Sequence, residues 1–87
     1  MSDVLVANAF WLDLPPAPKM VLLALCHRAD LQTGVCWPGV AELSIRCSLS
    51  KQSIIPHLRQ LEADGWVSRS PYRPRRAGET VRRWVNV

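Results

Sequence analysis

The sequence lacks any long apolar stretch. Its longest uninterrupted apolar run is the seven residues from Met20 to Cys26, whereas a helix that crosses a membrane needs about 20. The first residues also lack the charged start, apolar segment and small-residue cleavage site of a secretory signal. These absences exclude a transmembrane span, so we expect a cytoplasmic protein with no membrane partner.

Metal-binding and redox motifs are absent too. The three cysteines, Cys26, Cys36 and Cys47, are odd in number and form no C-x-x-C pair, which excludes a zinc ribbon and a thiol–disulfide redox motif. His27 and His57 form no pair with metal-ligand spacing, so no metal site is expected. Three unpaired thiols fit a reducing cytoplasm, in which free cysteine is a small buried hydrophobe.

The usual catalytic groups are also missing. The sequence shows no nucleophile–base pair, no carboxylate pair for acid–base chemistry and no glycine-rich phosphate loop. We therefore expect no enzymatic activity, no cofactor and no small-molecule ligand. Cys47 is the one candidate for a reactive side chain, and we expect it to be buried and structural instead.

What the sequence does have is an uneven distribution of charge. Residues 1–45 hold two bases and four acids, a net charge of −2, whereas residues 46–87 hold nine bases and three acids, a net charge of +6. A domain with one strongly basic half suggests an anionic partner, most simply nucleic acid. The alternative is a solvated, arginine-rich surface with no partner.

A first helix is predicted over residues 17–29. Proline is tolerated in the first turn of a helix, so Pro15, Pro16 and Pro18 mark the start of this helix. Apolar residues then recur at helical spacing: Val21, Leu22, Leu25 and Ala29. Met20 and Leu23 lie off this stripe, so the helix is apolar on more than one face. Either the preceding segment, residues 1–14, covers the second face as a short strand or irregular arm, or that face is a self-association surface.

A second helix is predicted over residues 39–47, after a loop over 30–37 whose turn residue is Gly34. Gly39 is an acceptable N-cap, although serine would cap better. Glu42, three residues later, stands where the acid of a capping box would be. The helix is short and ends near Cys47.

A third helix is predicted over residues 51–64 after a three-residue connection. Ser50 is its expected N-cap and Gly65 its stop residue. The apolar positions share one face: Ile54, Leu58 and Leu61, with Ile55 beside them. Two short helices joined by a tight turn, the second capped and amphipathic, predict a helix-turn-helix.

A β-hairpin is predicted after Gly65. Residues 66–70 form one strand, 71–78 a loop and 80–87 a second strand with alternating side chains, so that Trp84 and the valines lie on opposite faces. The alternation leaves open which face is inward. We expect Trp37 and Trp66, at the junctions between elements, to lie in the core.

These elements together resemble a known family. The sequence contains K-M-V-L-L-A-L-C-H-R-A-D, then W-P-G-V-A-E-L-S, then L-S-K-Q-S-I-I-P-H-L-R-Q-L-E-A-D-G-W-V. From about Phe10 to Val87 the chain is similar to the winged helix-turn-helix domains of phage and plasmid replication initiators and related bacterial regulators. The resemblance implies one α+β, mainly α domain over residues 1–87: a three-helix winged helix-turn-helix with a C-terminal β-hairpin wing.

The chain departs from that family at four positions. Gly39 and Ser48 replace the usual serine and glycine, and Ser44 replaces alanine. We expect the Ser44 hydroxyl to bond back to its own helix and Ser48 to adopt a left-handed conformation. Pro56 lies inside the third helix, where it either kinks the helix, at about 3 kcal/mol in a regular interior, or delays its start.

The third helix would be the recognition helix of such a domain. Its candidate DNA-binding residues are Ser50, Lys51, Gln52, Ser53, His57, Arg59 and Gln60. We expect Gln52, Ser53 and His57 near base edges, and Lys51 and Arg59 near phosphates. The alternative is an ordinary solvated helix face.

The wing supplies the second set of candidates. These are Arg69, Arg73, Arg75, Arg76, Arg82 and Arg83. We expect them to meet phosphates or to enter a minor groove, and Tyr72 to stack on the loop or touch a sugar.

The sequence thus predicts sequence-specific binding of double-stranded DNA by a transcriptional regulator or an origin-binding module. The alternative is a winged-helix protein–protein interaction module that uses the apolar first helix and the N-terminal arm. Whether the chain works as a homodimer on two half-sites stays open, because no coiled coil enforces it.

Overall fold

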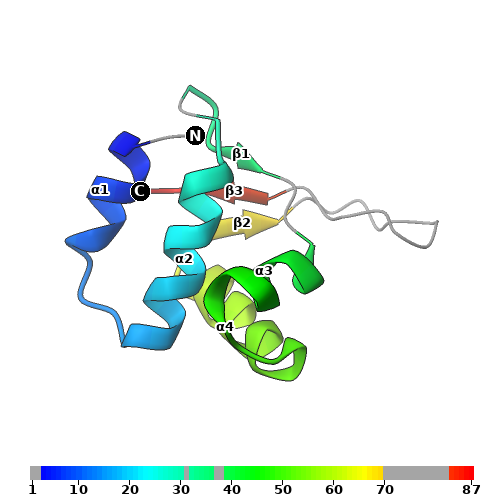
Figure 1. The fold of residues 1–87 in the computed structure, drawn as a ribbon. Helices are drawn as coiled ribbons and strands as arrows, with labels where there is room; N and C mark the ends of the chain where they lie inside the picture. The colour runs from blue at the N-terminus through cyan, green and yellow to red at the C-terminus, as the bar shows by residue number, and fades with distance from the viewer. Residues whose placement is uncertain (1–2, 31, 37–38, 70–82) are drawn as a thin grey trace.

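The structure is a computed structural model that describes residues 3–30, 32–36, 39–69 and 83–87. Within these residues the chain forms four helices and three short strands, shown in Figure 1. They are α1 (Asp3–Phe10), α2 (Pro16–Arg28), β1 (Val35–Cys36), α3 (Val40–Cys47), α4 (Lys51–Ala63), β2 (Val67–Arg69) and β3 (Arg83–Val85). The prediction of a mainly helical fold with a small antiparallel sheet is confirmed, but a three-helix count is wrong.

The additional helix is α1, where a strand or irregular arm was expected. Leu5 and Ala9 stand four residues apart, and both are buried where α1 packs against α2. The β-branched residues Val4 and Val6 lower the intrinsic helix propensity of this segment. Burial against α2 outweighs that preference, because tertiary contact supplies most of the stability of a short helix.

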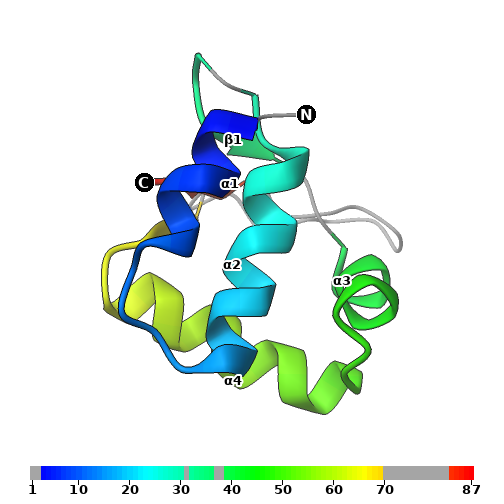
Figure 2. The ribbon, with the colours of Figure 1, turned by 60° about the vertical axis from the view of Figure 1, so that its left-hand side comes forward.

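Helix α2 is the centre of the molecule. Figure 2 shows it running between α1 and α3, with α4 crossing near its start. Its buried residues are Val21, Leu22, Leu25 and Cys26, which lie on more than one face because neighbours surround the helix. Helix α1 covers part of the second apolar face, so Leu23 is partly buried, whereas Met20 remains 47% exposed.

The three strands form an antiparallel sheet in the order β1-β3-β2. The pairing of β2 with β3 agrees with the predicted hairpin. Residues 70–82, which hold its predicted loop, lie outside the described residues. Arg83 and Val85 are buried on β3 and Trp84 is half-buried, so the face that carries the valine points inward.

Strand β1 was not expected, because residues 30–37 were predicted as a loop. Two residues are too few to show an alternating pattern. Val35 pairs with Trp84, and Cys36 pairs with Arg83. Gly34 allows the backbone before β1 to lie close to β3. Its φ is +71°, and a Cβ at this position would lie 2.8 Å from the carbonyl oxygen of Val85. Glycine is therefore required at this turn.

A network of hydrogen bonds ties the end of β3 to the end of α4. The backbone N–H of Asn86 donates to the carbonyl of Trp66 at 2.9 Å, and its side-chain amide donates to the carbonyl of Gly65 and the hydroxyl of Ser68, each at 3.0 Å. Trp66 itself is half-buried and packs against the core, as expected. Trp37 lies outside the described residues. No helix in the described part of the chain is long and apolar enough to cross a membrane.

Candidate nucleic-acid interface

The turn between α3 and α4 is held by hydrogen bonds at the end of α3. Ser48 adopts the expected left-handed conformation, with φ 55° and ψ 40°. The N–H of Leu49 then donates to the carbonyl of Ser44 at 3.1 Å, and that of Ser48 donates to the carbonyl of Ile45 at 3.4 Å. This is the Schellman arrangement, which satisfies carbonyls that the helix end would leave free.

The Ser44 hydroxyl adds a further bond to this turn. It donates to the carbonyl oxygen of Leu49 at 2.5 Å, so the expectation that it bonds back to its own helix is wrong. Since the N–H of Leu49 already donates to the carbonyl of Ser44, the two residues are joined by hydrogen bonds in both directions. Ser44 thus adds a side-chain contact to the turn that joins α3 to α4.

Helix α3 is seated on α2 by its apolar face and one acidic residue. Leu43 and Cys47 are buried, and the Cys47 thiol lies 3.8 Å from the carbonyl oxygen of Met20. Gly39 is the N-cap, as predicted, but no side chain completes the cap. Glu42 instead lies 3.6 Å from Arg28 of α2 and 3.5 Å from Arg46. Its carboxylate partly offsets two of the positive charges on this side of the molecule.

Helix α4 begins at Lys51 and is capped by Ser50. The Ser50 hydroxyl accepts a hydrogen bond from the backbone N–H of Ser53 at 3.2 Å, which confirms the predicted cap. It also lies 3.0 Å from the Ser53 hydroxyl. Both hydroxyls are therefore engaged within the protein. At the other end, Gly65 has a φ of +85° and terminates the helix as expected.

Pro56 lies inside α4 without delaying its start. The helix is continuous from Lys51 to Ala63, so the alternative of a later start is wrong. Proline has no N–H, so the carbonyl of Gln52 loses its usual donor four residues along. Pro56 stands on the exposed face of the helix, where water can reach that carbonyl.

The exposed face of α4 is defined by the buried one. Ile54, Leu58 and Leu61 are at most 3% exposed, so the predicted core stripe is confirmed. The exposed residues between Lys51 and Gln60 form one continuous strip, which we call the α4 strip: Lys51, Gln52, Ile55, Pro56, Arg59 and Gln60. Ser53 and His57 are half-buried along one edge of it.

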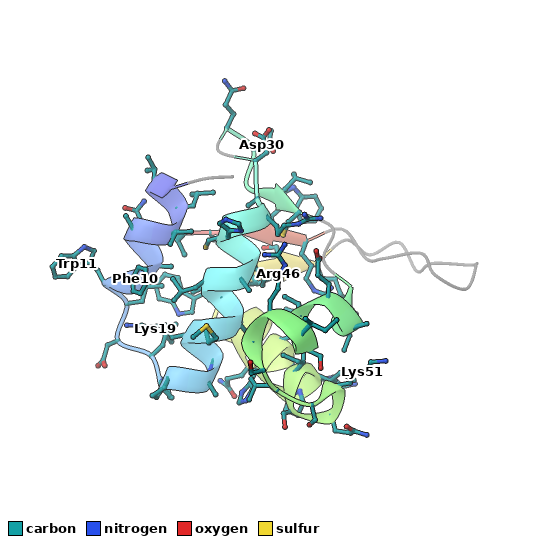
Figure 3. All side chains as sticks on the ribbon, viewed as in Figure 1. Phe10, Trp11, Lys19, Asp30, Arg46 and Lys51 are labelled. Carbon is teal, nitrogen blue, oxygen red and sulfur yellow. The ribbon has the colours of Figure 1, made fainter. Side chains whose placement is uncertain are left out.

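The polar side chains of the α4 strip differ in whether they are already bonded. The Gln60 amide donates to the Asp64 carboxylate at 3.0 Å. Among the described residues, the side chains of Lys51, Gln52 and Arg59 have no hydrogen-bond or ion-pair partner. Figure 3 shows Lys51 pointing outward from the start of α4, on the side of the molecule opposite Phe10 and Trp11.

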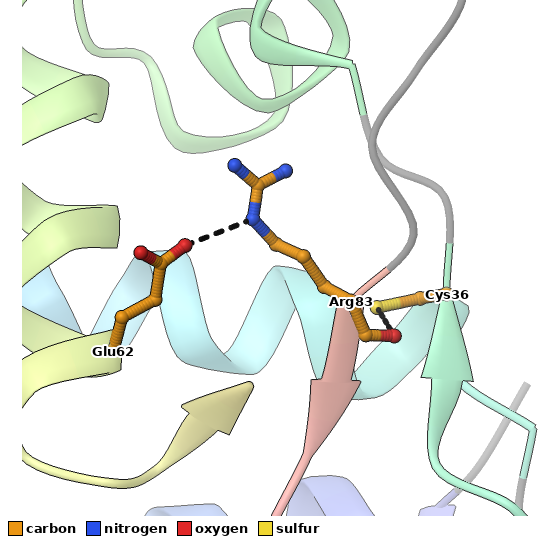
Figure 4. Close-up of polar contacts among 3 residues, drawn as sticks. All are labelled: Cys36, Glu62 and Arg83. Atoms are coloured by element: carbon orange, nitrogen blue, oxygen red, sulfur yellow. Dashed lines mark hydrogen bonds and ion pairs between the residues drawn. The ribbon is translucent and has the colours of Figure 1, made fainter. Parts of the chain in front are cut away.

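The arginines of the predicted wing fall into three groups. Arg69 is exposed on β2. Arg83 is buried: its side chain is 10% exposed, and its Nε donates to Oε1 of Glu62 on α4 at 3.4 Å (Figure 4). Its backbone oxygen lies 3.6 Å from the Cys36 thiol. This placement differs from the predicted DNA contact and gives Arg83 a structural role between sheet and helix. Arg73, Arg75, Arg76, Arg82 and Tyr72 lie outside the described residues.

The cysteines are all free and buried. Burial raises the pKa of the Cys26 thiol to about 12 and that of Cys36 to about 11, against the opposing effect of Arg83 and Arg28 on Cys36. Burial also raises the pKa of Cys47. The thiolate is the reactive form, so these side chains act as part of the core.

Sequence reasoning overlooked Ile55 as a surface residue. It was placed beside the core stripe, yet it is 41% exposed and lies within the α4 strip. The signal was present in the spacing. Ile55 stands four residues after Lys51 and four before Arg59, and residues four apart share one face of a helix.

These features define a helix-turn-helix protein. Helix α3 is followed by the left-handed turn at Ser48 and the capped helix α4, and both helices pack against α2. A family model described as a helix-turn-helix domain matches residues 12–67, from before α2 into the start of β2. The match covers more than half of the chain, and the chain belongs to this family. Searches of curated proteins and of solved structures found no match. A helix-turn-helix domain points to DNA as the partner.

Proposed function

We propose that this chain is a winged helix-turn-helix domain that binds double-stranded DNA in a sequence-specific manner. Helix α4 enters the major groove with the α4 strip facing the bases. The observation that carries the proposal is that Lys51, Gln52 and Arg59 are exposed and unpartnered within the described residues, on a helix joined to α3 by a hydrogen-bonded turn. The three side chains thus offer hydrogen-bond donors on the exposed face of α4.

The charge at the start of α4 supports a phosphate contact there. The first turn of α4 contains no acidic residue, so no carboxylate of that turn offsets the positive end of the helix dipole. Lys51 adds its own charge to that end. A helix N-terminus with a lysine and no acidic residue in its first turn favours a phosphate oxygen.

The candidate residues of α4 take different roles in the proposal. We assign Gln52 to adenine, with which a glutamine amide can form two hydrogen bonds, and Arg59 to phosphate or guanine. His57 stays a candidate for a base edge from its half-buried position. Ser50, Ser53 and Gln60 already make internal hydrogen bonds, so they contribute to DNA binding only if they exchange those bonds.

The arginine-rich hairpin is the second proposed contact. Arg69 on β2 is exposed, and the segment that follows holds Arg73, Arg75, Arg76 and Arg82. We assign these residues to phosphates or a minor groove, where they fix position and carry little sequence information. Arg83 is left out of this set because it is buried against Glu62.

In vitro selection from random duplex DNA, followed by a salt titration by fluorescence anisotropy, tests the proposal. We expect enrichment of one motif and a log K that falls with log salt at a slope of about −4.5 if about five phosphates are neutralised. A selection that enriches nothing, together with an affinity that does not respond to salt, would contradict it. A recovered palindrome would also reveal a homodimer on two half-sites.

The biological setting that fits such a domain is a small transcriptional regulator or the origin-binding module of a replication initiator, in the cytoplasm. Either could use a recognition helix and a basic wing, so the domain alone does not separate the two. The position of the selected motif, next to promoters or within an origin, separates them.

A second candidate function is a protein-interaction module. The observation that favours it is the exposure of apolar side chains on and after α1: Val4 is 56% exposed, Phe10 58% and Trp11 90%. Phe10 and Trp11 lie on the side of the molecule away from Lys51 (Figure 3). Binding to duplex DNA in a gel shift with excess non-specific competitor favours the first function; no shift, with capture of a protein through α1, favours the second.

A further inference from the structure

Ile55 is an unusual component of the α4 strip. It is 41% exposed, although burying an isoleucine side chain is favourable. Its neighbours along the helix are Lys51 and Gln52 before it and Arg59 after it, all exposed and unpartnered within the described residues. Pro56, next in sequence, is also exposed. The centre of the strip is therefore apolar and is bordered by cationic and amide donors.

This arrangement matches what the major groove presents at an A·T pair. Adenine offers an acceptor and a donor that a glutamine amide can pair with, and thymine offers a 5-methyl group that only an apolar side chain recognises. Gln52 and Ile55 are three residues apart, which is about 4.5 Å along the helix axis. That separation is small, and base pairs are stacked about 3.4 Å apart, so a helix lying in the major groove could bring the two side chains to the same or neighbouring pairs.

The side chain of Ile55 also suits a fixed contact. A β-branched residue in a helix has one strongly preferred χ1 rotamer, so its methyl groups are held in one direction. Ile55 is 41% exposed, so part of this residue is already covered by the protein and part remains accessible. Little side-chain freedom is lost when such a residue meets a ligand.

We infer that Ile55 contacts the 5-methyl group of a thymine in the major groove and thereby determines one position of the target sequence. The inference rests on the proposed function. It adds a specificity residue that contributes no hydrogen bond and no charge. Ile55 thus separates thymine from cytosine by its methyl group, beside an adenine that Gln52 reads.

The experiment uses the duplex recovered by in vitro selection with the wild-type chain. Each thymine is replaced singly by deoxyuridine, which keeps base pairing and removes only the methyl group. We expect one replacement to weaken wild-type binding about fourfold, the effect of losing one buried methyl group. In Ile55→Ala the same replacement leaves affinity unchanged, and in Ile55→Val part of the effect remains.

Ile45→Ala is the matched control. Ile45 is an exposed isoleucine on α3, 80% exposed and outside the α4 strip, so this variant should keep the full thymine dependence. Circular dichroism melting verifies that all three variants fold. The inference is overturned if Ile55→Ala retains the fourfold effect, or if no thymine in the site shows a methyl effect with the wild type. If the wild type binds no duplex at all, the proposed function itself is overturned.

Discussion

Replacing Ser48 by glycine should stabilise the protein. Ser48 stands at φ 55° and ψ 40° in the turn between α3 and α4. The left-handed region costs an L-residue about 1–2 kcal/mol. The Ser48 side chain is exposed and makes no hydrogen bond among the described residues, so its removal loses no contact. Part of this stabilisation is lost again, because glycine loses more backbone conformational entropy on folding than serine does.

The net effect of Ser48→Gly is therefore a gain of about 0.5–1 kcal/mol in the free energy of unfolding. For a domain of this size, that raises Tm by about 2–8 °C. Urea denaturation followed by circular dichroism, with thermal melting alongside, measures both quantities. An unchanged denaturant slope m would show that the substitution leaves the surface exposed on unfolding unchanged, so that the two free energies can be compared directly.

Two companion variants separate backbone strain from other causes. Ser48→Ala removes the hydroxyl and keeps the left-handed strain, so it should gain nothing. Gly65→Ala creates the reverse situation: φ there is +85° and a Cβ meets nothing within 4 Å, so the loss of about 1 kcal/mol comes from the backbone alone. If Ser48→Ala stabilises as much as Ser48→Gly, the reasoning from the left-handed turn is wrong.

Three further predictions follow from the fold and the proposed site. Gly34→Ala should lower the free energy of unfolding, measured in urea, by about 2 kcal/mol or more, which exceeds the loss in Gly65→Ala. Both positions have a positive φ, but at Gly34 a Cβ would also lie 2.8 Å from a backbone oxygen of β3. An equal loss in the two variants would mean that the structure relieves this close contact without cost. Gln52→Ala should relax the selected sequence at one base, whereas Arg75→Ala with Arg76→Ala should weaken all duplexes alike; identical sequence profiles would refute this division of roles. The pKa of Cys26 is raised from 9.0 to about 12, so the folded state favours the neutral thiol. The stabilising contribution of Cys26 should therefore be complete below pH 9 and decline as pH rises from 9 towards 12. Rapid thiol labelling of the native protein at pH 8 would contradict the burial of the cysteines.

The helix-turn-helix could be predicted from the sequence because its signals are local. Ser50 bonds to a group three residues away, and Gly65 and Ser48 each end a helix through their own φ. The core stripe of α4 repeats at helical spacing within one segment. Such features depend on residues close together in the sequence, so they can be predicted without a structure.

The parts that sequence reasoning missed depend on distant partners. Helix α1 is stabilised because Leu5 and Ala9 are buried where it packs against α2. Strand β1 can pair with β3 because Gly34 allows the two backbones to lie close together. Arg83 could not be told apart from the other arginines of the hairpin, because the carboxylate that it meets lies 21 residues earlier. Ile55 was misread for the opposite reason: residue type suggested the core, while its position on α4 faces outward.

The contacts that join β3 to α4 have a thermodynamic consequence. Arg83 donates a hydrogen bond to Glu62, and Asn86 bonds to the backbone around Gly65, so these contacts join α4 and the segment after it to the sheet. Association commonly loses free energy to the ordering of flexible parts. A partner that contacted both α4 and the sheet would meet two elements already joined in the folded chain, so less ordering would be left for the association step.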